Sequence, residues 1–394
     1  MENNNKRIRK SIWDNDGLRS FIAALACILI GLLIGYIVLL IINPDNANEG
    51  IMKILKNFMN KNSEKLRLKS FGNTLINTAP LILCSLSILF AYKTGLFNIG
   101  AAGQYVIGAG AALYCAYQFS AKWYICILAA IVASAIWGAI SGTLKSYLNV
   151  NEVISGIMLN WISLYTVNAL MKNYIRVGEK DTLDLFSVKS PALIPNLGLG
   201  KFFGNNERVT IAIPLAIIIA IIIWIVLDKT RFGYEIRATG LNKNAARYAG
   251  MREKRNIILT MMIAGALAGI AASFLFLSGF KTWDTNQSSV PAMGFNGIAA
   301  AFLGGLNPIG VIFSSYFIQH ITDGGSSLTG LYPTQISDMI SAIIIYLCGF
   351  VLYMKLKMSV KKGTRGNRNA PDPIKDPVTP PTPAAEEEKK GGEA

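Results

Sequence analysis

Side chains that could carry out catalysis are sparse in this chain of 394 residues. His320 is its single histidine, and none of the five cysteines belongs to a Cys-x-x-Cys pair, so the pattern indicates no metal site and no redox centre. Gly200-Lys201 is followed by Phe202 rather than by Ser or Thr, which argues against a phosphate-binding loop for ATP. The sequence also has no HExxH motif and no serine-nucleophile elbow. We predict a protein that is not an enzyme and that binds no cofactor or metal of its own.

Amide side chains in otherwise apolar stretches indicate a different kind of chemistry. The stretch 95–104, GLFNIGAAGQ, has three glycines and two amides, and further amides occur in 150–163 and 294–318. Polar groups at membrane depth are costly unless they line a water-filled path or pack against protein. Trp161 and Phe295 adjoin Asn160 and Asn296 in the sequence, and such an aromatic ring could meet the face of a base while the amide meets its edge. We predict a translocation path formed by Asn98, Gln104, Asn160, Trp161, Phe295, Asn296 and Asn307; capping or cross-linking of helices is the alternative for each residue.

A second functional candidate is a polar segment, residues 229–255, which we call the basic island. It has eight basic and two acidic residues, a net charge of +6 (8 − 2), and it lies between two apolar runs. The positive-inside rule places such a loop in the cytoplasm. Gly240 and Asn242 are suited to end one helix and cap the next, so we predict two short surface helices. Small residues among them would let another protein approach closely, although a basic loop that only fixes topology remains the alternative.

The elements that must position these residues are membrane helices. The chain is 52% hydrophobic and only 15% charged, with a mean hydropathy of +0.40, whereas a soluble domain carries roughly 25% charged residues. Repeated apolar runs of about 20 residues predict an all-α, polytopic membrane protein. The formal charge of +15 lies mostly in loops beside these runs, so membrane topology explains it better than a nucleic-acid partner does.

Individual spans can be placed from the apolar runs. The clearest cover residues 21–42, 72–92, 123–144, 211–227, 256–277 and about 336–354. The run 294–318 is divided by Asn307-Pro308 and reads as a broken or re-entrant pair of half-helices, with a single kinked helix as the alternative. Gly-x-x-x-Gly spacings at 138/142 and 265/269 suit close helix packing. We expect about ten membrane crossings, counting the half-helices separately.

The domain organisation follows from these spans and from the charges between them. Residues 1–19 form a cytoplasmic segment, 20–357 the transmembrane domain with a near-neutral external loop at 173–209, and 358–394 a disordered cytoplasmic tail. The sequences FNIGAA (97–102) and FNGIAA (295–300) echo one another, so we suspect an internal repeat.

Residues 43–70 fit the charge rule least well. They hold six basic residues and three acidic ones, which favours the cytoplasmic side, whereas the order of the spans places them outside. The side of the membrane on which they lie therefore stays undecided. Ile51, Ile54, Leu55 and Phe58 share one helical face, which predicts a surface helix in the outer membrane interface.

Three stretches together resemble a known family. GYEIRATGLNKNAARYAGM in the basic island, GLFNIGAAGQ (95–104) and VNEVISGIMLN (150–160) resemble the ABC importer permeases of the branched-chain amino acid, ribose and nucleoside superfamily, most of all its nucleoside branch. Ala102 stands where that pattern usually has Glu. In this family the cytoplasmic loop docks into the ATPase subunit, and the residues that match its pattern are Gly233, Arg237, Gly240, Asn242, Ala245, Ala246 and Gly250.

The resemblance implies an ATP-driven importer, for nucleosides in preference to simple sugars such as ribose or galactose. It implies three partners: a second, related permease, a cytoplasmic ATPase that binds the ATP, and an external lipoprotein receptor. The chain would lie in a bacterial cell membrane with both termini inside. An ion- or proton-coupled carrier and a passive channel are the alternatives. Acidic residues within the membrane are nearly absent, with Glu152 near a helix start and Asp338 near a span boundary, which disfavours the proton-coupled carrier.

Overall fold

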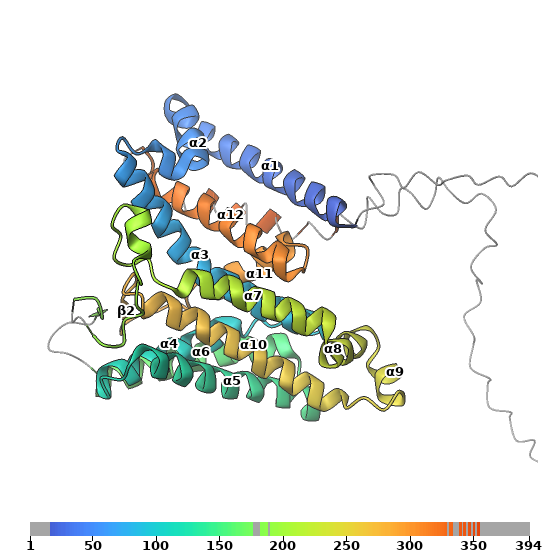
Figure 1. Cartoon of the computed structure of the whole chain (residues 1–394). Helices are drawn as coiled ribbons and strands as arrows, with labels where there is room; N and C mark the ends of the chain where they lie inside the picture. The colour runs from blue at the N-terminus through green and yellow to red at the C-terminus, as the bar shows by residue number, and fades with distance from the viewer. Residues whose placement is uncertain are drawn as a thin grey trace, which may run out of the picture. The chain divides into compact units, whose positions relative to one another are not determined.

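The computed structural model describes residues 16–175, 182–187, 190–328 and 331–333, and several positions between 339 and 354. The chain divides into two units, residues 1–355 and 356–394, and only the first contains described residues. The tail 358–394, residues 1–15 and most of the span expected at 336–354 lie outside the described residues. Within the first unit nearly everything is helical (Figure 1). One short antiparallel pair joins β1 (Thr182–Leu183) to β2 (Trp283–Asp284), so the all-α prediction is confirmed.

Long apolar helices make up most of this unit. Six of the described helices are long and apolar enough to cross a membrane: α1 (Asp16–Ile42), α3 (Glu64–Lys93), α5 (Trp123–Leu148), α6 (Glu152–Tyr174), α7 (Ala212–Lys229) and α10 (Glu253–Phe276). Three further apolar helices are α4 (Ala101–Gln118), α11 (Met293–Leu303) and α12 (Pro308–Ser326). Helices of this length and composition are those that span bilayers, which confirms the polytopic membrane protein.

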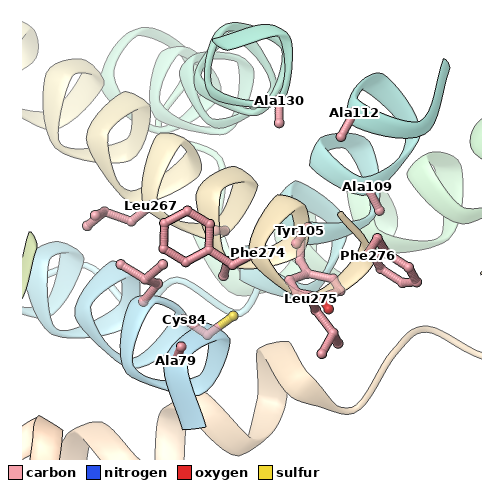
Figure 2. Close-up of a cluster of buried hydrophobic side chains, with 14 of the residues drawn as sticks. Ala79, Cys84, Tyr105, Ala109, Ala112, Ala130, Leu267, Phe274, Leu275 and Phe276 are labelled. Atoms are coloured by element: carbon pink, nitrogen blue, oxygen red, sulfur yellow. The ribbon is translucent and has the colours of Figure 1, made fainter. Parts of the chain in front are cut away.

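Helices α3 and α10 form the centre of the fold. Helix α3 is mostly buried from Gly72 to Ala91, with α7, α11 and α12 beside it, while α10 packs against α3, α4 and α5. Figure 2 shows part of the buried cluster around α10, which combines large side chains of α10 such as Phe274 and Leu267 with small residues such as Ala109 of α4 and Ala130 of α5. A Cβ atom added at Gly108 would lie 2.5 Å from the Cα atom of Gly269. Small residues let these backbones approach closely.

The two glycine spacings identified in the sequence meet in this interface. Gly138 and Gly142 of α5 face Met261 and Ile258 of α10, and Gly265 and Gly269 of α10 face Ser134 and Ala130 of α5. A methyl group at any of these glycines would collide with the backbone or the first side-chain atoms of the opposite helix. The spacing therefore marks a packing face between two helices of the same chain.

Helix α3 begins earlier than the apolar pattern suggests. It starts at Glu64, eight residues before the predicted span, and Pro80 lies inside it. The basic residues of 64–71 led us to leave these positions out of the predicted span, but Glu, Lys, Leu and Arg are all good helix formers. Charged residues at the end of a span lengthen the helix beyond the apolar core without interrupting it.

The segment before α3 contains the predicted helix, but its surroundings differ from those expected. Helix α2 (Ala47–Lys56) lies between the 3-10 turns η2 (Pro44–Asn46) and η3 (Asn57–Asn60). Ile54 is fully buried, and Gly50 contacts Leu39 of α1 and Tyr332. The apolar face of α2 therefore packs on protein, against α1 and α12, rather than only on the membrane interface.

The break at Asn307-Pro308 gives two helices, not a single kinked one. Helices α11 and α12 are separated by residues 304–307, where Gly305 and Leu306 have φ values of 66° and 54°. Left-handed backbone at two successive residues interrupts the helix, and the two helices pack against each other. The echoing sequences differ locally, since Asn98 precedes α4 while Asn296 lies inside α11, and the internal repeat stays a prediction.

Candidate functional site

The amide pair Asn98 and Gln104 is buried at the start of α4. The Asn98 Nδ2 atom donates to Gln104 Oε1 at 3.0 Å and to Ser87 Oγ of α3 at 3.3 Å. Gln104 Nε2 donates back to Asn98 Oδ1 at 3.4 Å. Each side chain is 1% exposed. The pair therefore ties the connection between α3 and α4 to the first turn of α4 and, through Ser87, to α3.

Asn160 holds the same region from the side of α6. Its Oδ1 atom accepts from the Gly103 backbone N–H at 2.7 Å, and its Nδ2 atom donates to the Ile99 carbonyl at 3.1 Å. Gly103 and Gly156 leave no room for a side chain between α4 and α6. Asn98, Gln104 and Asn160, which we call the amide cluster, are thus mutually near and fully engaged within the chain in this conformation. Their place on a path stays a prediction.

The other four predicted path residues do not join the amide cluster. Trp161 lies on the outward face of α6, 42% exposed and stacked on Tyr165 with ring centroids 6.0 Å apart. It therefore points away from the buried Asn160. Phe295 is exposed and Asn296 half-buried on α11. Exposed Asn307 caps α12, where its Oδ1 atom accepts from the backbone N–H groups of Ile309 at 2.9 Å and Gly310 at 3.3 Å.

Helices α4 and α11 meet at Ala102 and Gly294. A Cβ atom at Gly294 would lie 2.5 Å from the Ala102 Cα atom and 2.8 Å from its Cβ atom. Ala102 is completely buried. A carboxylate at position 102, as the family pattern has it, would need α11 to move away, so the small side chain and the close contact belong together.

The basic island folds as the two short helices that the sequence predicts. They are α8 (Arg231–Leu241) and α9 (Lys243–Tyr248), and Asn242 ends the first and caps the second. Its Oδ1 atom accepts from the Ala245 N–H at 3.0 Å, while Thr230 caps α8 by accepting from the Gly233 N–H at 3.1 Å. Capping of this kind satisfies backbone donors that a helix start leaves free.

Gly240 has a different role from the helix break expected of it. It lies within α8, where a Cβ atom would come within 2.8 Å of the Thr94 carbonyl carbon and 2.9 Å of the Gly95 nitrogen. Gly95 itself has a φ of 74°, which other residues rarely adopt. Backbone thus lies directly on backbone between α8 and the connection that leads to the amide cluster.

Polar contacts reinforce the attachment of α8 to the membrane helices. Asn256 of α10 donates from Nδ2 to Thr239 Oγ1 of α8 at 3.2 Å, and both side chains are buried. Arg237 Nη1 lies 3.0 Å from Asp228 Oδ1 at the end of α7. One buried hydrogen bond and one ion pair thus tie α8 to α10 and α7.

The tip of the basic island exposes two large side chains that the sequence reading did not single out. Leu241 is 90% and Tyr248 94% exposed. Of the seven residues carried over from the family pattern, Gly233 and Ala246 are buried, Arg237 and Gly240 half-buried, and Asn242, Ala245 and Gly250 exposed. The signal that could have revealed the tip is an apolar residue on each side of a short polar helix, in a segment that is otherwise strongly charged.

The predicted external loop lies at the end of the helices opposite to α8 and α9 (Figure 1). Its described parts include β1 and the 3-10 turn η4 (Leu199–Phe203), and the Ile194 N–H donates to the Leu277 carbonyl at 2.9 Å. A hydrogen bond from Ser187 holds the pKa of Asp184 below its ordinary value. No group of three or more potential metal ligands occurs among the residues that the structure describes.

Comparisons with known proteins agree with this arrangement. Residues 70–349 match the family model described as branched-chain amino acid transport system permease component. The chain is 34% identical to the guanosine ABC transporter permease protein NupP of Bacillus subtilis, over 70% of this chain and 79% of NupP. It is 32% identical to the nucleoside ABC transporter permease protein NupB of Lactococcus lactis, over 84% and 92% respectively. It is 28% identical to the glucose ABC transporter permease protein TsgB13 of Haloferax volcanii, over 86% and 90%. With the family model covering most of its length, the chain belongs to the family of branched-chain amino acid transport system permease components.

Proposed function

We propose that this chain is the membrane permease of an ATP-driven importer for nucleosides that works by alternating access. As a member of a permease family, it is a multi-pass membrane transport protein and not an enzyme. Nucleosides are favoured over sugars because NupP and NupB, at 34% and 32% identity, are more similar to it than TsgB13 at 28%. The importer requires a partner ATPase, and ATP is bound there rather than by this chain.

The observation that carries the proposal is the contact between α8 and the α3–α4 connection. The exposed tip residues Leu241 and Tyr248 dock into the ATPase, because large apolar side chains that are almost fully exposed suit burial in a partner. Movement of the ATPase shifts α8. Since Gly240 lies on Gly95 with no side chain between them, the shift reaches the residues that hold the amide cluster.

The amide cluster supplies the transport step in this mechanism. In the described conformation Asn98 and Gln104 satisfy each other, so they offer no free hydrogen-bonding groups to a substrate. A shift of the α3–α4 connection separates them, and their amides then exchange partners with the polar edge of a nucleoside. Such exchange costs little net free energy because one hydrogen bond replaces another, which suits a site that must also release its substrate.

The remaining partners follow from the same proposal. A second, related permease completes the membrane part, and an external lipoprotein receptor delivers the nucleoside to the loop 173–209. The basic island and both termini then lie in the cytoplasm, in agreement with the positive charge of the island. Docking of the receptor places the selective step outside the membrane, so the path itself needs only a weak site.

Uptake by the assembled complex in liposomes tests the proposal. Labelled guanosine, adenosine, uridine, ribose and glucose are supplied on the receptor side with ATP on the opposite side. We expect ATP-dependent uptake of at least one nucleoside ahead of both sugars. Preferential uptake of ribose or glucose would contradict the assignment of nucleosides as the substrate but not the importer proposal. Uptake that is independent of the ATPase would contradict the importer proposal itself.

A further inference from the structure

A groove of about 820 Å³ opens beside the tip of the basic island. One wall is the first turn of α8, with Arg231, Tyr234 and Glu235, and the other is the connection from α9 into α10, with Arg252 and Arg255. Leu241 and Tyr248 do not line it. The groove is therefore a feature separate from the exposed tip.

The charge of the groove is strongly one-sided. Three guanidinium groups face one carboxylate, a net charge of +2 (3 − 1). Arg231 Nε is 3.3 Å from Glu235 Oε1, but the Arg231 side chain is 93% exposed, and an ion pair so exposed contributes little. Arg252 and Arg255 form no ion pair or side-chain hydrogen bond with any residue that the structure describes. Two of the guanidinium groups that line the groove thus lack an ion-pair partner among the described residues.

The backbone of the groove is open enough for a ligand to reach these groups. Gly250 has a φ of 79°, and nothing lies within 4 Å of the position where its Cβ atom would be. Arg252 is the N-cap residue of α10 and makes no side-chain capping bond. An anion between the arginines would also face this helix start, where the backbone dipoles favour negative charge. The arginines supply the main attraction for an anion, and the helix start adds a smaller electrostatic contribution.

We propose that this groove binds a phosphate group through Arg252 and Arg255, with Arg231 closing it from α8. A planar guanidinium offers two parallel N–H donors that match two phosphate oxygens, which distinguishes it from a lysine. Bound phosphate links the start of α8 to the start of α10, so it sets how freely α8 moves. The proposal rests on the proposed function only in placing the basic island in the cytoplasm. Two sources offer this chemistry there: the headgroup of an acidic phospholipid, and a soluble phosphate such as a nucleoside monophosphate.

The test is made on the full chain assembled with its partner subunits in nanodiscs, without substrate or ATP. One arm compares phosphatidylcholine alone with phosphatidylcholine plus phosphatidylglycerol, and native mass spectrometry counts the retained phosphatidylglycerol. The other arm measures binding of AMP and of inorganic phosphate from solution. Because neither arm measures uptake, failure of the importer proposal does not decide this one.

Two double variants separate a built site from general surface charge. R252Q/R255Q removes the two unpaired guanidinium groups, while K243Q/K254Q removes two charges of the same island that do not line the groove. We expect R252Q/R255Q to lose at least about tenfold in affinity for the phosphate-bearing ligand, and K243Q/K254Q to keep it. R252K/R255K, which keeps the charge but not the paired donors, is expected to fall between them.

The arms also identify the source. Phosphatidylglycerol that is retained by the wild type and lost only in R252Q/R255Q supports a lipid, and saturable AMP or phosphate binding with the same pattern supports a soluble ligand. The proposal is overturned if neither ligand class binds the wild type, or if both double variants lose binding equally. Thermal unfolding in detergent checks that the variants are folded, and R252K/R255K gives a second reading if R252Q/R255Q is not.

Discussion

Gly240 of α8 lies with its backbone directly on that of Gly95, the residue at which the α3–α4 connection begins to turn. A Cβ atom at Gly95 would be 3.1 Å from the Gly240 carbonyl oxygen, and one at Gly240 would be 2.9 Å from the Gly95 nitrogen. Asn98 of the amide cluster follows three residues later. A surface helix and a buried polar cluster are therefore joined through a contact that tolerates no side chain.

Gly240→Val should break this contact and uncouple transport from ATP hydrolysis. The added side chain has to displace the α3–α4 connection, because the nearest atoms are backbone. We expect uptake to fall by at least about tenfold, as is found when positioning is lost away from the chemistry, while the ATPase keeps most of its activity. Uptake and hydrolysis are measured on the same liposomes. Asn244→Gln, at an exposed position in α9, is the control, and full uptake by Gly240→Val would contradict the coupling route.

Tyr248→Ala should weaken assembly with the ATPase without destabilising the permease. The side chain is 94% exposed, so its removal should change the free energy of unfolding by less than about 0.5 kcal/mol. A tyrosine that acts as a hot spot of an interface contributes about 2 kcal/mol or more, which predicts a loss in affinity of about thirtyfold if Tyr248 anchors the docking. Affinity is measured by titrating the ATPase against the permease in nanodiscs. Tyr174→Ala, an exposed tyrosine at the far end of α6, should have no effect; an equal loss in both variants would refute docking at the tip.

Gly250→Asp should insert and assemble but transport poorly. Its φ of 79° disfavours any side chain, although Asp and Asn tolerate this region better than most residues, and the space around it is open. The new carboxylate would pair with the arginines beside it and reduce the positive charge of the groove between α8 and α10. Gly250→Asn carries the same backbone cost without the charge, so a defect confined to Gly250→Asp assigns the effect to charge. Uptake at the wild-type rate by a normally assembled Gly250→Asp complex would remove Gly250 from the coupling residues.

Local features of the chain were predictable where the chemistry is local. The break between α11 and α12 follows from Asn307, Pro308 and the two glycines before them, and the two helices of the basic island follow from Asn242 as a cap. Each depends on a few residues in sequence. The start of α3 at Glu64 was missed because charge was given more weight than helix propensity.

Features that depend on distant residues could not be predicted in this way. The partner of Asn160 is the backbone of Gly103, and that of Asn98 is Gln104 across a turn. An amide in an apolar run indicates only that some partner exists. Whether it faces a path or a neighbouring helix is decided by tertiary packing. Trp161 shows the consequence, since it follows Asn160 in sequence but is exposed where Asn160 is buried.

Ala102→Glu should destabilise the permease through the contact with Gly294. Burial of a carboxylate without a counter-charge is costly, and the side chain also lacks room between α4 and α11. We expect a loss of about 3 kcal/mol or more in the free energy of unfolding, measured by denaturation in detergent. Ala102→Gln has nearly the same shape without the charge, and it separates crowding from burial of charge. Unchanged stability in both variants would show that α11 can move away, and the contact would then not restrain it.

Cysteine labelling tests which predicted path residues become accessible during transport. In a background in which the native cysteines are replaced, Asn307→Cys should react with a water-soluble thiol reagent at rest, because that side chain is exposed. Asn98→Cys, Gln104→Cys and Asn160→Cys should be protected at rest, since these positions are 1%, 1% and 2% exposed. With ATP and substrate present, the three buried positions should react faster, and excess nucleoside should slow that reaction. Cys126, which is native and buried in the core, is the control that should stay protected throughout when it alone is retained. If the three amide positions are equally protected at rest and during measured uptake, they do not line the path, and their role is limited to cross-linking the helices.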